Sequence, residues 1–315
     1  MTVTLNAAVD KTLRVANLQI GLRHRCAQGL VQPGGKGINV ARALKTLGQP
    51  VLATGLAGGR TGTRIVEELT AAGILNDFVR IQDESRTSTL LVDPALGTST
   101  EIVEYGPSIE PHELDMVAAK LAYLMRGVAT AVFAGSLPRD VPEDWYANAL
   151  REARRARLQT VLDSEVEPLR LGLAGEPDLV APNQLEAEEL VGFEFQMPAD
   201  FTAGMERIVD MGARNVIITH GTGCAALIKE PGKTHRMWAE IEPLEPVSEV
   251  GSGDALLAGF LAARQGNRSL GDVLKHAVGC GAANTQTFGA GSFDPREAVR
   301  LAGTVALREL DPSVE

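Results

Sequence analysis

Two glycine-rich segments of this sequence have the residue types that bind and transfer an anionic group. In one of them, residues 250–255 (VGSGDA), glycines precede a run of small apolar residues, 255–263, which predicts a helix. Backbone N–H groups at the start of a helix lack internal partners, so they can hold the charge of a phosphoryl group in transfer. A carboxylate beside such a turn, Asp254, is suited to take a proton from an attacking hydroxyl. An Asp also caps helices without any catalytic role, and the turn alone leaves both interpretations open.

The other segment, residues 34–37 (GGKG), lies between a strand-like stretch and a strongly helical one. Its glycines let a ligand approach the backbone, and the helix that follows offers further N–H groups. The segment matches neither the phosphate-binding loop GxxxxGK[ST] nor the dinucleotide fingerprint GxGxxG. Taken alone, it is equally consistent with a tight turn.

These turns are set in an alternation of short apolar stretches and longer amphipathic ones, which is typical of βαβ units around a parallel sheet. The predicted strands are residues 2–6, 51–57, 129–135, 160–163, 179–181 and 215–219, and the clearest predicted helix is 38–47. Two segments, about 12–32 and 87–105, depart from this alternation and show a β pattern instead. We therefore expect a small β sheet, made of two excursions, on a single α/β domain that spans residues 1–315.

Composition restricts the partners and the compartment. Lys and Arg number 30 and Asp and Glu number 40, so the net charge of −10 disfavours a nucleic acid or an anionic membrane as the main partner. The three cysteines are far apart and in no metal-binding spacing, which indicates reduced thiols and a cytoplasmic protein. The first residues show no basic region followed by an apolar one, and no apolar run approaches the roughly 18 residues of a membrane span. We expect neither a secretion signal nor a membrane anchor.

Together the two turns resemble the paired signatures of the ribokinase/PfkB carbohydrate kinase family. Further matches follow in the family's order, namely TLNAAVD (4–10), GSLP (135–138), PNQLE (182–186) and THG (219–221). The opening TLN…D, the segment GGKGINVAR (34–42) and the pair Ser85-Arg86 are similar to the branch that acts on phosphosugars. The resemblance implies a Rossmann-like ribokinase fold with a β lid. It also implies an ATP- and Mg²⁺-dependent transfer of the γ-phosphate to a hydroxyl of a phosphorylated ketohexose.

Several substrates are compatible with this resemblance. Fructose 1-phosphate, converted to fructose 1,6-bisphosphate, is the leading candidate. Tagatose 6-phosphate and fructose 6-phosphate are close alternatives, because the sequence does not reveal which hydroxyl receives the phosphate. An unphosphorylated sugar or a nucleoside fits Arg86 and the GGKGIN segment less well. A non-catalytic sugar-phosphate sensor would have no need of Asp254 in an intact anion-binding turn.

The resemblance also assigns roles to individual residues. The catalytic set is the base Asp254 with the anion-hole residues Gly251, Ser252 and Gly253. The substrate-binding set is Asp10, Arg25, Gly35, Lys36, Asn39, Arg86 and Ser136. The nucleotide-binding set is Asn183, Thr219, Gly221 and Asn284, and Glu186 is expected to hold Mg²⁺ through water. A homodimer formed through the β lid is implied as well.

Physical arguments support parts of the substrate-binding assignment. Asp10 directly follows a predicted buried strand, so we expect it at the carboxyl end of that strand, where open α/β sheets bind their ligands. An acidic protein attracts a sugar phosphate only where cations are concentrated, and Arg25, Lys36 and Arg86 are the candidates.

The nucleotide side shows one match and one departure. Asn183 and Glu186 are one helical turn apart, so both can face one site, although their spacing is also that of a capping box. The family's usual Lys before the PN pair is Ala181 here, which removes a positive charge expected near the nucleotide phosphates.

Overall fold

The computed structural model describes residues 1–26, 28–266 and 268–310. Its larger β sheet has the strand order β15-β14-β13-β12-β11-β10-β9-β1-β4-β5, and β6 pairs with β4. The strands of this sheet are β1 (Thr2–Thr4), β4 (Leu52–Gly58), β5 (Leu75–Asn76), β6 (Val79–Ile81), β9 (Thr130–Ala134), β10 (Gln159–Asp163), β11 (Leu179–Val180), β12 (Val216–His220), β13 (Gly223–Glu230), β14 (Lys233–Glu240) and β15 (Ala306–Glu309). Pairing is parallel from β12 to β5 and antiparallel from β12 to β15. All six predicted strands are present, each within one or two residues of its predicted ends.

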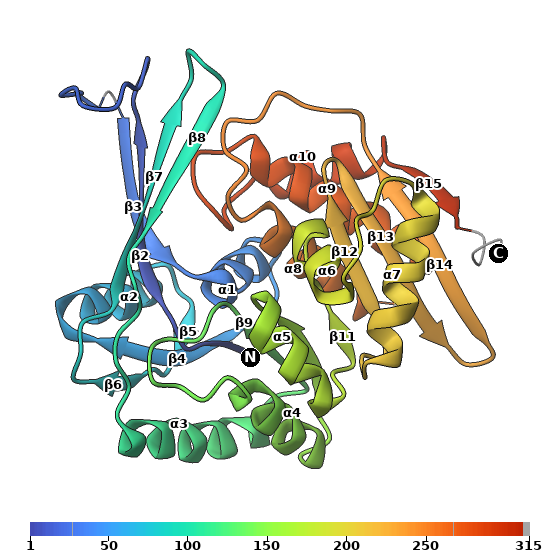
Figure 1. The fold of residues 1–315 in the computed structure, drawn as a ribbon, viewed down its shortest axis with the longest axis horizontal. Helices are drawn as coiled ribbons and strands as arrows, with labels where there is room; N and C mark the ends of the chain where they lie inside the picture. The colour runs from blue at the N-terminus through green and yellow to red at the C-terminus, as the bar shows by residue number, and fades with distance from the viewer. Residues whose placement is uncertain (27, 267, 311–315) are drawn as a thin grey trace.

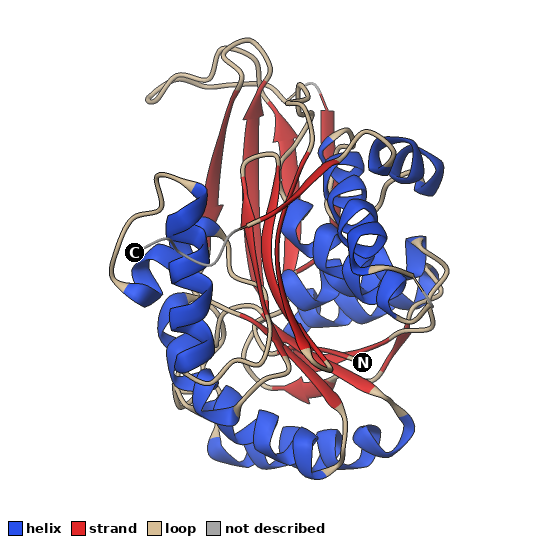
Figure 2. Cartoon of the chain, turned by 90° about the vertical axis from the view of Figure 1, so that its right-hand side faces the viewer, coloured by secondary structure: helices blue, strands red, loops and turns tan. Residues whose placement is uncertain are grey.

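Helices cover both faces of the large sheet (Figures 1 and 2). The helices on one face are α1 (Lys36–Thr46), α2 (Gly59–Ala71), α8 (Ser252–Arg264), α9 (Leu270–Thr285) and α10 (Pro295–Ala302). Those on the other face are α3 (Pro111–Leu124), α4 (Trp145–Arg155), α5 (Val166–Gly172), α6 (Gln184–Val191) and α7 (Pro198–Asp210), with the short turns η1 (Met125–Gly127) and η2 (Leu173–Gly175). Each face buries its own apolar cluster, so the sheet separates two cores and confirms the predicted α/β class.

A second, small sheet stands out from one end of the molecule (Figure 1). Its strand order is β3-β2-β7-β8, and its strands are β2 (Ala8–Arg14), β3 (Gln28–Gly34), β7 (Arg86–Asp93) and β8 (Thr98–Val103). Both segments that depart from the α/β pattern supply strands to it, but β2 begins at Ala8, before the excursion predicted from about residue 12. That the chain is a single domain with this sheet as its lid stays a prediction.

The sequence predicts Asp10 at the carboxyl end of a strand of the large sheet, and this prediction is wrong. The strand predicted over residues 2–6 ends at Thr4, and the chain turns before it enters the small sheet. Asp10 is therefore the third residue of β2, opposite Gln32 of β3. The boundary is hidden in the sequence because residues 2–9 are buried throughout and contain no Gly or Pro to mark the turn.

Two further features are plain in the described residues. No helix among them is long and apolar enough to cross a membrane. The cysteines, Cys26, Cys224 and Cys280, are free.

Candidate active site

Helix α1 organises the site, because one of its faces presents polar side chains at intervals of three or four residues. Each of these side chains donates a hydrogen bond to a segment distant in the sequence, and the four are Lys36, Asn39, Arg42 and Thr46. Their partners lie on β10, on α6, on α8, on β3 and in the loop between α9 and α10. The helix therefore gathers segments that are up to about 250 residues apart in the sequence.

The turn before α8 has the geometry of an anion-binding site. Gly251 is the N-cap, with φ at 77°, and a Cβ on it would lie 2.5 Å from the Cβ of Ala290, so only glycine fits. The sequence predicts that the amide of Ser252 is free, but this amide donates to the carbonyl of Glu249 (3.2 Å). Among the described residues we find no hydrogen-bond acceptor for the N–H of Gly251, Gly253 or Asp254. Three amides therefore remain available to an anion at this helix N-terminus.

Asp254 is buried beside these amides, with 7% of its surface exposed. Its Oδ2 accepts a hydrogen bond from Nδ2 of Asn39 (2.9 Å). Burial, and then the neighbouring charge of Asp163, raise the pKa of Asp254 to about 7, although Lys36 and Asn39 favour the ionised form. A carboxylate with a pKa near neutral pH is suited to exchange a proton with a substrate hydroxyl.

Lys36 lies between two carboxylates. Its Nζ donates to Oδ1 of Asp163 (2.7 Å) and to Oε1 of Glu186 (3.0 Å). Burial alone would lower the pKa of Lys36, but the two carboxylates outweigh it and raise the pKa. Burial also raises the pKa of Glu186, against the effect of Lys36. The ammonium is thus charged and paired with two carboxylates at the boundary between α1, β10 and α6.

Residues predicted to bind the sugar come together at the base of the small sheet. The carboxylate of Asp10 lies against Gly34, where a Cβ would fall 1.9 Å from its Oδ2. Burial raises the pKa of Asp10 to about 6, while the charge of Arg86 opposes this shift. The Nε of Arg86 donates to the carbonyl oxygen of Asn6 (3.3 Å), and Nδ2 of Asn6 donates to Oγ of Ser136 (3.0 Å).

Arg25 is not brought to this cluster. It belongs to the connection between β2 and β3, beyond the terminal Arg14–Gln28 pair of the hairpin. The cluster lies at the opposite end of the hairpin, where Ala8 pairs with Gly34. Arg25 is exposed, and we find no hydrogen bond or ion pair for it within the described residues.

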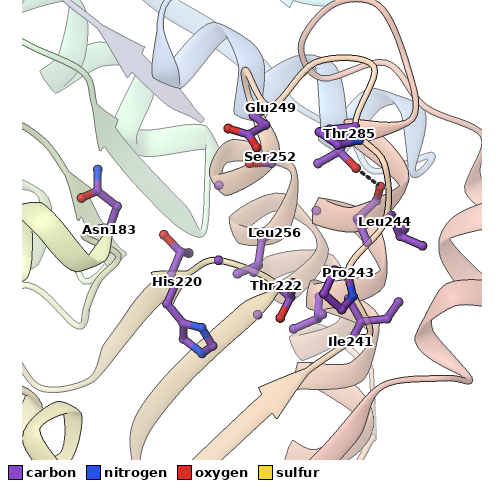
Figure 3. A pocket seen from close by; sticks show the side chains of 18 of the residues that line it. Asn183, His220, Thr222, Ile241, Pro243, Leu244, Glu249, Ser252, Leu256 and Thr285 are labelled. Atoms are coloured by element: carbon purple, nitrogen blue, oxygen red, sulfur yellow. Dashed lines mark hydrogen bonds between the residues drawn. The ribbon is translucent and has the colours of Figure 1, made fainter. Parts of the chain in front are cut away.

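A cavity of about 760 Å³ ends at the anion-binding turn (Figure 3). Its walls are the start of α6, the β12–β13 turn, residues 241–249, and helices α8 and α9. Three residues of the predicted nucleotide-binding set line it, Asn183, Thr219 and Gly221. No lysine or arginine is among the described residues that line the cavity, whereas Glu242 and Glu249 are. The charged side chains of this lining are therefore acidic, and the effect of Ala181 on nucleotide binding stays a prediction.

Asn284, the fourth predicted nucleotide-binding residue, lies behind the cavity. It is fully buried, and its side chain is used at both ends by the protein. Its Nδ2 donates to the carbonyl of Val250 (2.9 Å), and its Oδ1 accepts from the N–H of Gly291 (2.8 Å). Asn284 therefore supports the anion-binding turn, and the neighbouring Thr285 lines the cavity in its place (Figure 3).

Glu186 forms the capping box that its spacing predicts, and its role at Mg²⁺ stays a prediction. Its Oε2 accepts from the N–H of Asn183 (2.9 Å), and Oδ1 of Asn183 accepts from the N–H of Glu186 (2.9 Å), which is a capping box. Its other oxygen faces Lys36. In the described part of the chain, no group of three or more His, Cys, Asp or Glu could hold a metal by itself. Mg²⁺ typically keeps waters and binds through one or two carboxylates and substrate phosphates, and Glu186 with Asp163 fits that pattern.

Sequence reasoning missed three residues of the site: Asn6, Arg42 and Asp163. Asp163 ends a correctly predicted strand, and strand ends are where such sheets bind ligands, so a signal was present. Arg42 continues the three-residue spacing of Lys36 and Asn39 on the predicted helix, which is a second usable signal. Asn6 belongs to the TLN segment that carries the resemblance, but no role is assigned to it there, because no Gly or Pro marks the turn that contains it.

Comparison with known proteins gives similarity over almost the whole chain. The model of the pfkB family carbohydrate kinases matches residues 3–297. A 1-phosphofructokinase of Borreliella burgdorferi is 33% identical over 282 residues, which are 90% of each chain. A 1-phosphofructokinase of Rhodobacter capsulatus is 30% identical over 313 residues, which are 99% of this chain and 98% of the relative.

A solved structure is similar in fold as well. The crystal structure of phosphofructokinase-2 from Escherichia coli in complex with substrates and products has a TM-score of 0.87 and 26% identity, covering 96% of this chain and 97% of that one. Other structures of the E. coli protein contain fructose-6-phosphate or show a tetrameric inhibited form. The similarity confirms the predicted ribokinase-like fold with its second, small sheet.

Proposed function

The chain belongs to the pfkB family of carbohydrate kinases, phosphotransferases with an alcohol group as acceptor, and from this premise we propose that it transfers the γ-phosphate of ATP to fructose 1-phosphate. The observation that carries the proposal is the position of Asp254. It follows Ser252 and Gly253, which line the large cavity, and it lies beside three amides for which the described residues offer no acceptor. Helix α1 contacts Asp254 through Asn39, and through Arg42 it contacts Gln32, which lies opposite Asp10 in the small sheet. A donor in the cavity and an acceptor at the cluster would meet at this carboxylate.

In the proposed mechanism, Asp254 takes the proton of the acceptor hydroxyl as its oxygen attacks the γ-phosphorus. The bond from that phosphorus to the β-phosphate oxygen breaks, and ADP carries the leaving electron pair. The amides of Gly251 and Gly253 face the negative charge on the phosphoryl oxygens, together with the positive end of the α8 dipole. Positioning and charge stabilisation are what phosphoryl transfer chiefly requires of a protein.

The charge of the nucleotide phosphates has few protein cations to meet it. Lys36 is at hand, held by Asp163 and Glu186, but the described lining of the cavity holds no Lys or Arg. Mg²⁺, when bound with the nucleotide, would neutralise phosphate charge at this point. Glu186 and Asp163 are the residues we assign to its water shell, and Lys36 would then turn from them toward the phosphates. We therefore expect a strict dependence on a divalent cation.

The cluster at the small sheet suits a phosphorylated sugar. The Nη groups of Arg86 have no hydrogen-bond partner among the described residues, so they can pair with a phosphate already on the substrate. The Oδ1 of Asn39 is buried without a partner in the described part of the chain, and a sugar hydroxyl can satisfy it. Asp10, ionised above about pH 6, can accept further hydroxyl donors.

Fructose 1-phosphate is proposed because both curated relatives described above are 1-phosphofructokinases. Fructose 6-phosphate is the second candidate, because the E. coli protein of the same fold has been solved with that sugar. The experiment must also separate three other acceptors, namely tagatose 6-phosphate, free sugars and nucleosides. A further alternative is that the protein is a non-catalytic sugar-phosphate sensor.

A measurement of ADP release with Mg²⁺ and ATP tests the proposal. The panel contains fructose 1-phosphate, fructose 6-phosphate, tagatose 6-phosphate, free fructose and a nucleoside. We expect the highest kcat/KM with fructose 1-phosphate and only poor turnover of free fructose. A higher kcat/KM with fructose 6-phosphate or tagatose 6-phosphate would make that sugar the substrate, and the protein would still be a phosphosugar kinase. Binding without ADP release on every sugar would support the sensor instead.

We further propose that the small sheet forms a homodimer and that the protein acts in the cytoplasm. All six residues of β8 are exposed, and apolar side chains gather on and beside it, including Leu96, Ile102, Val103 and Tyr105. Light scattering should give twice the chain mass. A double substitution, Ile102→Glu with Val103→Glu, should give the monomer mass, whereas Leu75→Glu, at an exposed leucine of the large sheet, should not.

A further inference from the structure

Arg42 connects two segments that hold opposite sides of the site. Its Nη2 donates to Oε1 of Gln32 (2.9 Å) on β3 of the small sheet. Its Nε donates to the carbonyl oxygen of Ala290 (3.1 Å) in the loop between α9 and α10. A guanidinium is a planar fork that can serve two acceptors in fixed directions at once.

The Gln32 end of this connection belongs to the sugar side. Gln32 is 6% exposed and lies directly opposite Asp10 in the β2–β3 pairing. The loop also packs on β3 directly, because a Cβ on Gly289 would lie 2.6 Å from Cδ2 of Leu30 and 2.9 Å from Oε1 of Gln32. A displacement of β3 would therefore disturb both Asp10 and the loop.

The Ala290 end belongs to the anion-binding turn. The Cβ of Ala290 lies 2.5 Å from where a Cβ on Gly251 would be, so the loop and the turn are in close contact. Asn284 then joins the next loop residue, Gly291, to the carbonyl of Val250 in the turn. Any shift of Ala290 would press on the amides that precede Asp254.

We propose that Arg42 is a positioning residue that ties the small sheet to the anion-binding turn. This connection keeps the amides of residues 251–254 at a fixed position relative to the substrate held at β2. This inference rests on the proposed function, because it takes the turn to be the place where phosphoryl charge is stabilised. We assign Arg42 a positioning role and not substrate binding, because its Nε and Nη2 both donate to protein acceptors.

The test uses the full-length protein in variants that cut the tie at either end. Arg42→Ala removes both contacts of Arg42, and Arg42→Lys keeps the charge without the fork. Gln32→Ala removes the contact to the sheet together with the longer, direct hydrogen bond from Nε2 of Gln32 to the carbonyl oxygen of Ala290 (3.5 Å). Arg154→Ala is the matched control, because Arg154 also donates to a backbone carbonyl and to a side-chain oxygen, on α4 across the large sheet. The readouts are kcat and KM with the phosphosugar, and amide hydrogen exchange in peptides that cover residues 247–256.

We expect Arg42→Ala to lower kcat by about tenfold or more, while KM for the phosphosugar changes by less than about threefold. Amides of the turn should exchange about tenfold faster, because the turn opens locally without its support. Arg42→Lys should restore only part of the rate. The loss in the double variant with Gln32→Ala should be clearly smaller than the product of the two single losses, because both substitutions break the connection between Gln32 and Arg42.

Three results would overturn the proposal. One is a normal kcat and normal exchange in Arg42→Ala. Another is multiplication of the two losses in the double variant, which would mean that Gln32 and Arg42 act independently. The third is the same loss of kcat or the same faster exchange in Arg154→Ala, which would indicate general destabilisation. If the wild type phosphorylates no sugar, the proposed function fails, and the exchange measurement still decides whether Arg42 holds the turn.

Discussion

Replacement of Asp254 by Asn is expected to abolish catalysis and stabilise the fold at the same time. The substitution removes the proton acceptor, so we expect kcat to fall by about a hundredfold or more. Ground-state contacts to the sugar are largely retained, because the new amide oxygen can still accept from Asn39. The affinity for the phosphosugar should therefore change little.

The stabilisation follows from the pKa of Asp254, which burial raises from 3.8 to about 7. Between these two values the folded protein binds more protons than the unfolded chain, so stability falls as pH rises through that range. At pH 8 the ionised carboxylate costs the fold up to about 4 kcal/mol, since the pKa rises by about three units and each unit is worth about 1.4 kcal/mol. Asn has no charge to bury, and Asp254→Asn avoids this cost.

The assay is thermal unfolding of both proteins at pH 8 and pH 5, alongside kcat. At pH 8 the Tm of Asp254→Asn should exceed that of the wild type by roughly 4 °C or more, and at pH 5 the difference should shrink. Asp115→Asn, at an exposed position of α3, should change neither Tm nor kcat. A near-normal kcat in Asp254→Asn would refute the role as base, and an unchanged Tm at pH 8 would refute the electrostatic reasoning.

Other substitutions and conditions probe the remaining parts of the site. Arg86→Ala should raise KM for the phosphosugar by about one to two orders of magnitude, because roughly 1.5–3 kcal/mol of charge-assisted binding is lost. The kcat/KM for free fructose should stay nearly unchanged. Equal losses on both sugars would mean that Arg86 only supports the small sheet. Glu186→Gln should raise the Mg²⁺ concentration needed for half-maximal rate, whereas Glu189→Gln, on the exposed side of the same helix, should not. An unchanged Mg²⁺ requirement in Glu186→Gln would mean that Glu186 only caps the helix. In a pH titration, kcat should fall tenfold per pH unit below about 7 as Asp254 takes up a proton, and kcat/KM should fall more steeply below about 6, where Asp10 does so too. A flat kcat between pH 5 and 8 would contradict the assignment of Asp254, and a kcat/KM that falls no more steeply below pH 6 would contradict that of Asp10.

Local signals in the sequence were sufficient for the large sheet and for the turns at its edge. The strands β9 and β12 were predictable, because buried parallel strands are short apolar runs bounded by turn residues. The helix at Gly251 was predictable from its glycines and from the small apolar residues that follow. The small sheet was predictable only in part, since nothing in residues 2–9 marks where one sheet gives way to the other.

Pairings between distant segments were beyond any local signal. The sequence could identify Lys36 as a cation near a turn, but not Asp163, 127 residues away, as its partner. It could identify Ser252 as part of a helix start, but not that the carbonyl of Glu249 occupies its amide. All backbone amides are chemically alike, and the path of the chain decides which of them find a protein acceptor. The amides left without one determine what the site can bind.

Phosphorus NMR of the reaction with fructose 1-phosphate, ATP and Mg²⁺ tests the central claim most directly. The account predicts a second phosphomonoester resonance on the sugar that grows in step with ADP. It also predicts that this resonance grows at least about a hundredfold more slowly when the wild type is replaced by Asp254→Asn. Release of ADP with inorganic phosphate, and no sugar bisphosphate, would contradict the claim that the site transfers its phosphoryl group to a sugar hydroxyl.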